Sequence, residues 1–175
     1  PSRATKGGLG SARVDLDNGV IVSALVAVNA VGEIVDTVSN TVIAGIRAND
    51  VGEYDSAVDV ALGNTAKTPV AGTNTTLGLI ATNANLSKAQ LKKVAEMAHD
   101  GMARAIRPIH TQFDGDTVFA VSMPGSAGEK TTNADAQLIS IGVAGAKALE
   151  LAIVDAVRSA KSVGDVIACC DWRID

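Results

Sequence analysis

The segment that most constrains the fold is the run 20–28, which is apolar at every position except Ser23. Successive side chains of a strand point to opposite faces, so a run that is apolar on both faces predicts a central strand covered on both sides. The turn signal Asp17-Asn18-Gly19 precedes this run, and a further extended segment, 12–16, precedes the turn. Asn-Gly between two such segments predicts a β-hairpin whose second strand lies inside a sheet.

The rest of the chain alternates between strand and helix signals. Strands are predicted over 33–36, 76–82 and 117–123, and a long helix over 133–160. A second helix begins at Ser87, which forms a capping box with Gln90, and it runs to about residue 105 before Pro108 stops it. Residues 39–73 have little periodicity and predict a long surface loop with one helical turn near 57–62. The order predicts an α+β fold, a largely antiparallel sheet with helices on one face.

Composition excludes several classes of protein. Hydrophobic residues make up 47% of the 175 residues and the net charge is −4, with scattered Lys and Arg, so we expect a globular domain that binds no nucleic acid. We find no apolar run of transmembrane length and expect no membrane partner. Adjacent Cys169 and Cys170 predict free thiols in a cytoplasmic protein. His99 and His110 lack the spacing of metal ligands, so we interpret them as surface or packed histidines and expect no metal.

Two short polar segments stand at the beginnings of predicted strands. One is Asn74-Thr75-Thr76, which follows the long loop, and the other is Asp114-Gly115-Asp116-Thr117. Threonine-rich strand starts and Asp-Gly-Asp turns are both common, so neither segment alone indicates a function.

Taken together with other stretches, these segments resemble the L-aminopeptidase/D-esterase family of N-terminal-nucleophile hydrolases, which includes β-aminopeptidases and the nylon-oligomer hydrolase. The similar stretches occur in the family order and cover most of the chain outside the loop and the tail. They are 6–11 (KGGLGS), 24–32 (ALVAVNAVG), 74–83 (NTTLGLIATN), 99–111 (HDGMARAIRPIHT) and 114–120 (DGDTVFA).

The resemblance implies a four-layer αββα sandwich and autocatalytic cleavage between Asn74 and Thr75. Residues 1–175 would then be a single domain that lacks its N-terminal segment, in keeping with Pro1 in place of a start methionine. Residues 1–74, with the loop 39–73, would be the C-terminal part of the α subunit, and 75–175 the β subunit. The implied partners are the N-terminal remainder of the precursor, further copies of the chain in a homo-oligomer, and a small peptide or oligoamide substrate.

The implied chemistry centres on Thr75. Its hydroxyl would attack the carbonyl of Asn74, and water would hydrolyse the resulting ester. The new α-amine, with an ordinary pKa of about 8, would then act as general base for the same hydroxyl on an amide substrate. This mechanism needs no metal and no cofactor.

The resemblance also assigns the residues around the nucleophile. Lys6 would lie beside Thr75 and favour the neutral amine. The side chain of Asn29 would donate to the oxyanion, and removal of such a donor typically costs roughly 10²–10³-fold in rate. A backbone N–H at or after Thr76 would be the second donor. Asp114 and Asp116 would hydrogen-bond the Thr75 amine and Lys6.

Alternatives to an aminopeptidase or oligoamide hydrolase stay open. One is an acyltransferase of the ornithine acetyltransferase type, which has a similar fold and a self-exposed Thr. Another is a non-catalytic, uncleaved subunit. The Asn-Thr junction resembles the oligoamide-hydrolysing branch of the family, but α-peptides, β-peptides and D-amino-acid amides all remain candidate substrates.

Overall fold

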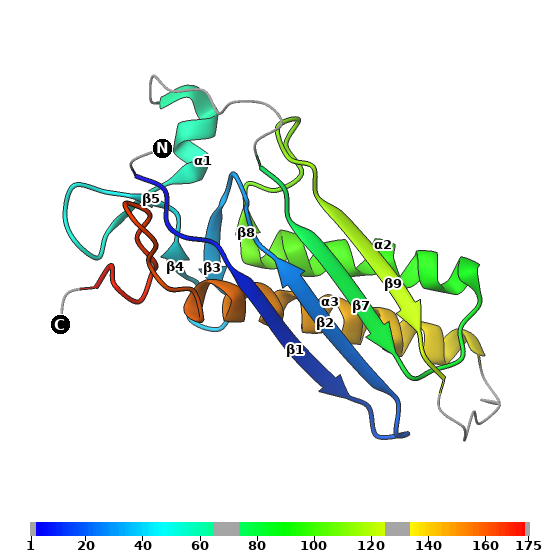
Figure 1. Cartoon of the computed structure of the whole chain (residues 1–175). Helices are drawn as coiled ribbons and strands as arrows, with labels where there is room; N and C mark the ends of the chain where they lie inside the picture. Colours follow the sequence, from blue (N-terminus) through cyan, green and yellow to red (C-terminus); the bar gives the residue numbers. More distant parts are fainter. Residues whose placement is uncertain (1–2, 65–73, 125–133, 174–175) are drawn as a thin grey trace.

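A four-stranded sheet forms the centre of the molecule in the computed structural model, which describes residues 3–64, 74–124 and 134–173 (Figure 1). Its strand order is β1-β2-β7-β9. The strands are β1 (Leu9–Asp15), β2 (Ile21–Ala27), β7 (Leu77–Thr82) and β9 (Thr117–Ser122). β1 and β2 form the predicted hairpin, with Gly19 at φ 78° in its turn, and β2 pairs antiparallel with β7. β7 and β9 are parallel, which the sequence had not predicted.

Two helices lie side by side on one face of this sheet, as predicted (Figure 1). They are α2 (Lys88–Ala105), which connects β7 to β9, and α3 (Ala134–Arg158). The predicted capping box is present: the Ser87 hydroxyl accepts from the Gln90 N–H at 3.3 Å, and Gln90 Oε1 accepts from the Ser87 N–H at 2.9 Å. This confirms the α+β class, and the described residues supply one sheet layer and one helix layer.

The core lies between the sheet and the two helices and is almost free of aromatic residues. Its largest fully buried side chains are aliphatic and include Val22, Val26, Ile80, Val94, Met102, Ile141, Leu149 and Ile153. Contrary to the sequence expectation, one apolar run, 137–158 of α3, is long and apolar enough to cross a membrane by length and composition alone. That run is 56% buried inside the molecule, so packing against the sheet and α2 accounts for its apolar character.

Glycine allows α2 and α3 to approach closely. A Cβ added at Gly101 would lie 2.1 Å from the carbonyl oxygen of Ala146, whereas one added at Gly145 would meet only Ile80 and Val94 methyls at 3.6 Å. We therefore expect Gly101→Ala to lower the free energy of unfolding by roughly 1–3 kcal/mol. Gly145→Ala should raise it by roughly 0.4–1 kcal/mol, because alanine restricts the unfolded chain. Urea unfolding of both variants measures the difference, and equal midpoints would contradict the close approach.

The other face of the sheet carries a second set of apolar side chains. Leu25 is 50% exposed, and exposed side chains on the neighbouring strands continue this apolar face: Leu9, Leu77, Phe119 and Val121. The register places Leu25 opposite Leu79, and Leu79 opposite Phe119. β2 is therefore central, as predicted, but within the described residues only one of its faces is covered.

Residues 39–64 contain more structure than the predicted loop. A three-stranded sheet has the order β4-β3-β8, and β5 pairs with β6. These strands are β3 (Glu33–Asp36), β4 (Thr41–Ala44), β5 (Ile46–Arg47), β6 (Tyr54–Asp55) and β8 (Ile106–Arg107). The predicted helical turn is confirmed as α1 (Ala57–Asp59) with the π-helical turn η1 (Val60–Asn64). The rest of the predicted loop, 65–73, lies outside the described residues.

Candidate active site

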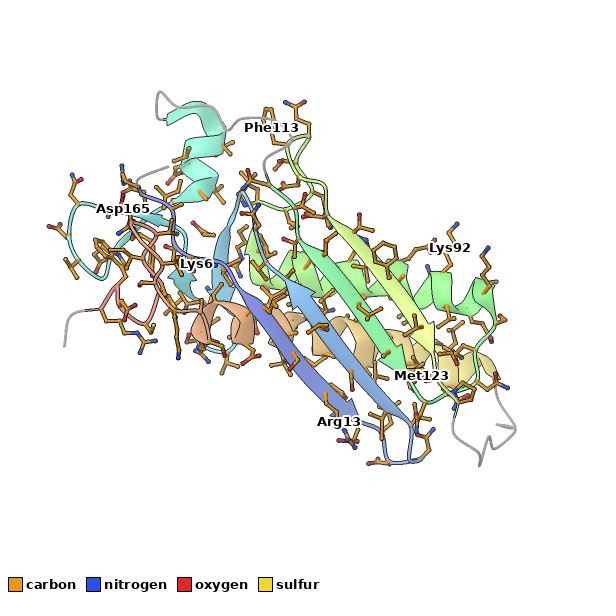
Figure 2. All side chains as sticks on the ribbon, viewed as in Figure 1. Lys6, Arg13, Lys92, Phe113, Met123 and Asp165 are labelled. Carbon is orange, nitrogen blue, oxygen red and sulfur yellow. The ribbon has the colours of Figure 1, made fainter. Side chains whose placement is uncertain are left out.

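The Asn74–Thr75 junction is held between two strands at one end of the main sheet. The Thr75 N–H donates to the carbonyl of Asn29, just beyond β2, at 2.9 Å. On the other side Asn74 forms a parallel bridge with Asp114, ahead of β9. Figure 2 shows Phe113, next to this bridge, at the end of the sheet opposite Arg13 and Met123. The backbone around the junction is thus fixed from both neighbouring strands.

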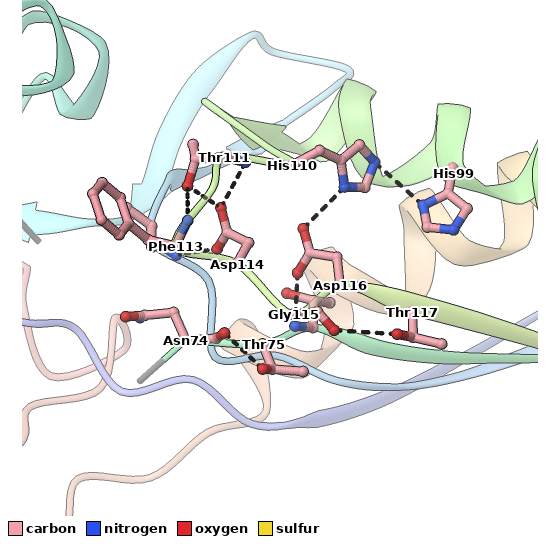
Figure 3. Close-up of polar contacts among 12 residues, drawn as sticks. Asn74, Thr75, His99, His110, Thr111, Phe113, Asp114, Gly115, Asp116 and Thr117 are labelled. Atoms are coloured by element: carbon pink, nitrogen blue, oxygen red, sulfur yellow. Dashed lines mark hydrogen bonds and ion pairs between the residues drawn. The ribbon is translucent and has the colours of Figure 1, made fainter. Parts of the chain in front are cut away.

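The Thr75 hydroxyl lies against the peptide bond that precedes it. Oγ1 donates to the carbonyl oxygen of Asn74 at 2.6 Å, and the Gly115 N–H donates to the same oxygen at 3.0 Å (Figure 3). The Gly115 N–H polarises this carbonyl and favours negative charge developing on its oxygen, and the hydroxyl contact holds Oγ1 next to the carbonyl group. The arrangement suits attack of the hydroxyl on the carbonyl carbon of Asn74.

Gly115 occupies a position where no side chain fits. A Cβ added there would lie 2.7 Å from Thr75 Oγ1. Gly115 is not among the residues with positive φ, so the space next to the hydroxyl, and not the backbone conformation, requires glycine here. The Asp-Gly-Asp turn therefore contributes a backbone donor and room for the Thr75 hydroxyl, as well as its two carboxylates.

The two carboxylates of this turn have different partners. Asp114 Oδ2 accepts from the N–H and the hydroxyl of Thr111, at 3.0 and 2.7 Å. Asp116 is almost fully buried, with its side chain 2% exposed, and its Oδ1 accepts from the Thr76 N–H at 2.8 Å. In the intact chain the Thr75 nitrogen is a peptide N–H bonded to Asn29, so the bonds from a free amine to Asp114 and Asp116 stay predictions.

Lys6 and Asn29 lie at the same end of the sheet as Thr75. Gly7 packs so closely on the segment after β2 that an added Cβ would be 2.1 Å from the Val28 carbonyl oxygen. The half-buried Lys6 donates from Nζ to the Gly7 carbonyl at 2.8 Å. Asn29 contributes its carbonyl to the Thr75 N–H, and the roles of its side chain and of the Lys6 ammonium stay predictions.

The sequence interpretation missed three groups in this site. The Gly115 N–H donates to the Asn74 carbonyl oxygen, whereas the Thr76 N–H, expected near the oxyanion, is bonded to Asp116. His110 Nδ1 lies 3.1 Å from Asp116 Oδ2, and His110 Nε2 lies 3.2 Å from His99 Nδ1. The only sequence signal was that His110 and Asp116 share one short loop segment, and spacing alone does not show that this segment folds back.

The electrostatics of the histidine pair favour a neutral ring at His99. Burial, and then the nearby charge of His110, lower the pKa of His99, while Asp116 and Asp100 act in the opposite direction. Among the described residues, no group of three or more His, Cys, Asp or Glu side chains is arranged to hold a metal ion. The described site therefore combines the Thr75 hydroxyl, backbone donors, two carboxylates and two imidazoles.

Comparison with known proteins points to one family. The sequence profile of peptidase family S58 matches residues 2–167. An uncharacterised aminopeptidase of Mycobacterium leprae is 37% identical over 94% of the chain, and a 6-aminohexanoate-oligomer endohydrolase of Kocuria is 30% identical over 79% of it. The chain spans 48% and 41% of these two relatives, so it corresponds to about half or less of their length.

Solved structures show the same fold. The Burkholderia β-aminopeptidase superposes with a TM-score of 0.50 at 28% identity, over 89% of this chain and 42% of that one. The L-aminopeptidase D-Ala-esterase/amidase of Ochrobactrum anthropi is described as a variant of the Ntn-hydrolase fold. It superposes with a TM-score of 0.58 at 21% identity, over 93% of this chain and 43% of that one. On the strength of the family match over 2–167, the chain belongs to peptidase family S58.

Proposed function

We propose that this chain is part of a self-cleaving amide hydrolase whose nucleophile is Thr75, made N-terminal by cleavage of the Asn74–Thr75 bond. The observation that carries the proposal is the close approach of the Thr75 hydroxyl to the Asn74 carbonyl oxygen, at 2.6 Å, with the Gly115 N–H on the same oxygen at 3.0 Å. Membership of peptidase family S58 favours hydrolysis over the transfer of an acyl group to ornithine.

Self-cleavage proceeds in two steps. Thr75 Oγ1 attacks the Asn74 carbonyl carbon, the C–N bond to Thr75 breaks, and the hydroxyl proton passes to the leaving nitrogen. The product is an ester between Asn74 and the Thr75 side chain. Water then hydrolyses this ester to give an Asn74 carboxylate, and the Thr75 hydroxyl is restored beside a free α-amine.

The mature site uses the same hydroxyl on an external amide. The Thr75 amine takes the hydroxyl proton and delivers it to the leaving amine of the substrate, and water completes the turnover. Lys6 and the Asn29 side chain assist at the amine and the oxyanion, and Asp114 and Asp116 orient the amine. The positions of these residues support the proposed roles. Asn29 and Asp114 flank the Asn74–Thr75 junction directly, and Lys6 lies beside the segment that carries Asn29.

The uncovered face of the main sheet is the surface on which the remainder of the precursor packs. Leu25 and Phe119 on that face are 50% and 58% exposed, and relatives are about twice as long as this chain. A second sheet there would bury this face and complete the four-layer αββα sandwich.

The substrates we propose are small peptides and oligoamides, in keeping with relatives named as aminopeptidases and an oligomer endohydrolase. We place the enzyme in the cytoplasm because Cys169 and Cys170 are free thiols.

Intact mass spectrometry of the full-length gene product tests the proposal. We expect two polypeptides, the second beginning at Thr75 by N-terminal sequencing, and amide hydrolysis that appears in step with cleavage. The substrates to assay are α-dipeptides, β-dipeptides, D-amino-acid amides and 6-aminohexanoate oligomers, together with acetyl transfer to ornithine. A chain that stays whole and hydrolyses none of these amides would overturn the proposal.

A further inference from the structure

A continuous series of hydrogen bonds leads from the backbone behind the nucleophile to the surface. The Thr76 N–H donates to Asp116 Oδ1 at 2.8 Å. Asp116 Oδ2 meets His110 Nδ1 at 3.1 Å, and His110 Nε2 meets His99 Nδ1 at 3.2 Å (Figure 3). The Asp116 side chain is 2% exposed and that of His110 is 39% exposed. The series therefore joins a buried carboxylate to a solvent-accessible ring.

The buried carboxylate needs both of its contacts. An ionised carboxylate that has lost water is stable only where donors reach its oxygens. One oxygen of Asp116 has a peptide N–H, and the other has the ring nitrogen of His110. Removing the ring would leave one side of Asp116 without that donor and free the carboxylate to turn away from Thr76.

The backbone conformation of His110 indicates that the surrounding structure fixes its contact with Asp116. His110 has φ 56°, in the left-handed region that non-glycine residues rarely adopt. Such a conformation persists only where the surroundings fix it, and here it directs the ring toward both Asp116 and His99. The two rings meet edge to face, with centroids 4.8 Å apart.

We propose that His110, backed by His99, is a positioning residue for the nucleophile: it holds Asp116 on the Thr76 N–H and so fixes the first peptide after Thr75. This role rests on the proposed function of Thr75. The pair also makes the site sensitive to acid. The facing nitrogens, His110 Nε2 and His99 Nδ1, share one proton, so charging both rings places two N–H groups against each other and breaks the contact.

The charged groups around the pair come from two elements. Asp100 lies beside His99 on α2, and Asp116 faces His110 from the start of β9. Burial and the nearby charge of His110 lower the pKa of His99, while both carboxylates act in the opposite direction on that ring. Because the pKa of His99 is lowered, we expect the rate of self-cleavage to fall only at a pH below the ordinary histidine pKa of about 6.5.

A matched pair of variants in the full-length chain tests the role. His110→Gly accepts the left-handed backbone and removes the ring, whereas His110→Asn accepts that backbone and places an amide N–H near the position of Nδ1. We expect self-cleavage of H110G to be slower by roughly 10- to 100-fold, the range for loss of a hydrogen bond to a charged group. H110N should recover most of this loss but lose the acid sensitivity, because an amide does not titrate.

The readout is the rate at which intact chain converts to two polypeptides between pH 5 and 8, before any free Thr75 amine exists to complicate the profile. If the wild type cleaves and H110G cleaves at the same rate with the same pH profile, the positioning role is wrong and the proposed function stands. If H110G does not fold, the comparison of the wild type with H110N tests the role. The positioning role is then wrong if the self-cleavage rates of both proteins fall in the same way at acidic pH. A wild-type chain that never cleaves overturns the proposed function itself.

Discussion

A Thr75→Ala chain is expected to remain a single polypeptide and to hydrolyse amides at least roughly 10⁴-fold more slowly than the wild type. The alanine has no hydroxyl to lie 2.6 Å from the Asn74 carbonyl oxygen, so neither the ester nor the N-terminal nucleophile can form. Intact mass separates one polypeptide from two, and amide hydrolysis by the purified chain gives the activity.

Thr75→Ser is the matched control for this variant. Serine keeps the hydroxyl and loses only the methyl group, so we expect the chain to be cleaved at the same bond. The T75A chain should still unfold cooperatively, because Thr75 is only partly buried and the substitution adds no volume. Cleavage of the T75A chain between residues 74 and 75 would show that another group attacks the bond.

Gly115→Ala is expected to slow self-cleavage by roughly 10²-fold or more, because the added Cβ would lie 2.7 Å from Thr75 Oγ1. That distance is too short for contact between carbon and oxygen, so the hydroxyl must turn away or the two strands must separate. A displacement of about 1 Å at a reacting group can cost about 10²-fold in rate. A time course of precursor conversion after expression measures the effect.

Gly145→Ala is the control for a glycine-to-alanine change elsewhere, because its Cβ meets side chains only at ordinary contact distance. It should mature at the wild-type rate. Gly115 is exposed, so G115A should keep its cooperative unfolding, and its defect should be confined to cleavage and activity. Maturation of G115A at the wild-type rate would mean that the observed Thr75 geometry is not the reactive one.

The elements that the sequence predicted well are those specified by local chemistry. The turn at Gly19 and the cap at Ser87 depend on a few neighbouring residues, and α2 and β2 have long, regular patterns. The strands between residues 41 and 55 and the strand β8 were missed because each has two to four residues. Pairing with distant segments, as between β8 and β3, stabilises such strands, and no local periodicity marks it.

The groups of the candidate active site differ in the same way, because some carry a local sequence signal and others do not. Asn74, Thr75, Asp114 and Asp116 carry recognisable side chains in short motifs, and the parallel pairing of β7 with β9 brings the two motifs together. The Gly115 N–H is a backbone group, so no residue type marks its role. The contact between His110 and His99 joins residues from a loop and a helix, and only the folded backbone brings them together.

The order of strands in the main sheet has a consequence for refolding. β1 and β2 precede the Asn74–Thr75 bond and β7 and β9 follow it, yet β2 and β7 are neighbours joined along six residue pairs. A cut at this bond therefore leaves two polypeptides that share one sheet and meet along the pairing of β2 with β7. Once denatured, they must find each other by diffusion, so recovery of the cleaved protein becomes second order and depends on concentration, whereas that of the uncut precursor stays first order.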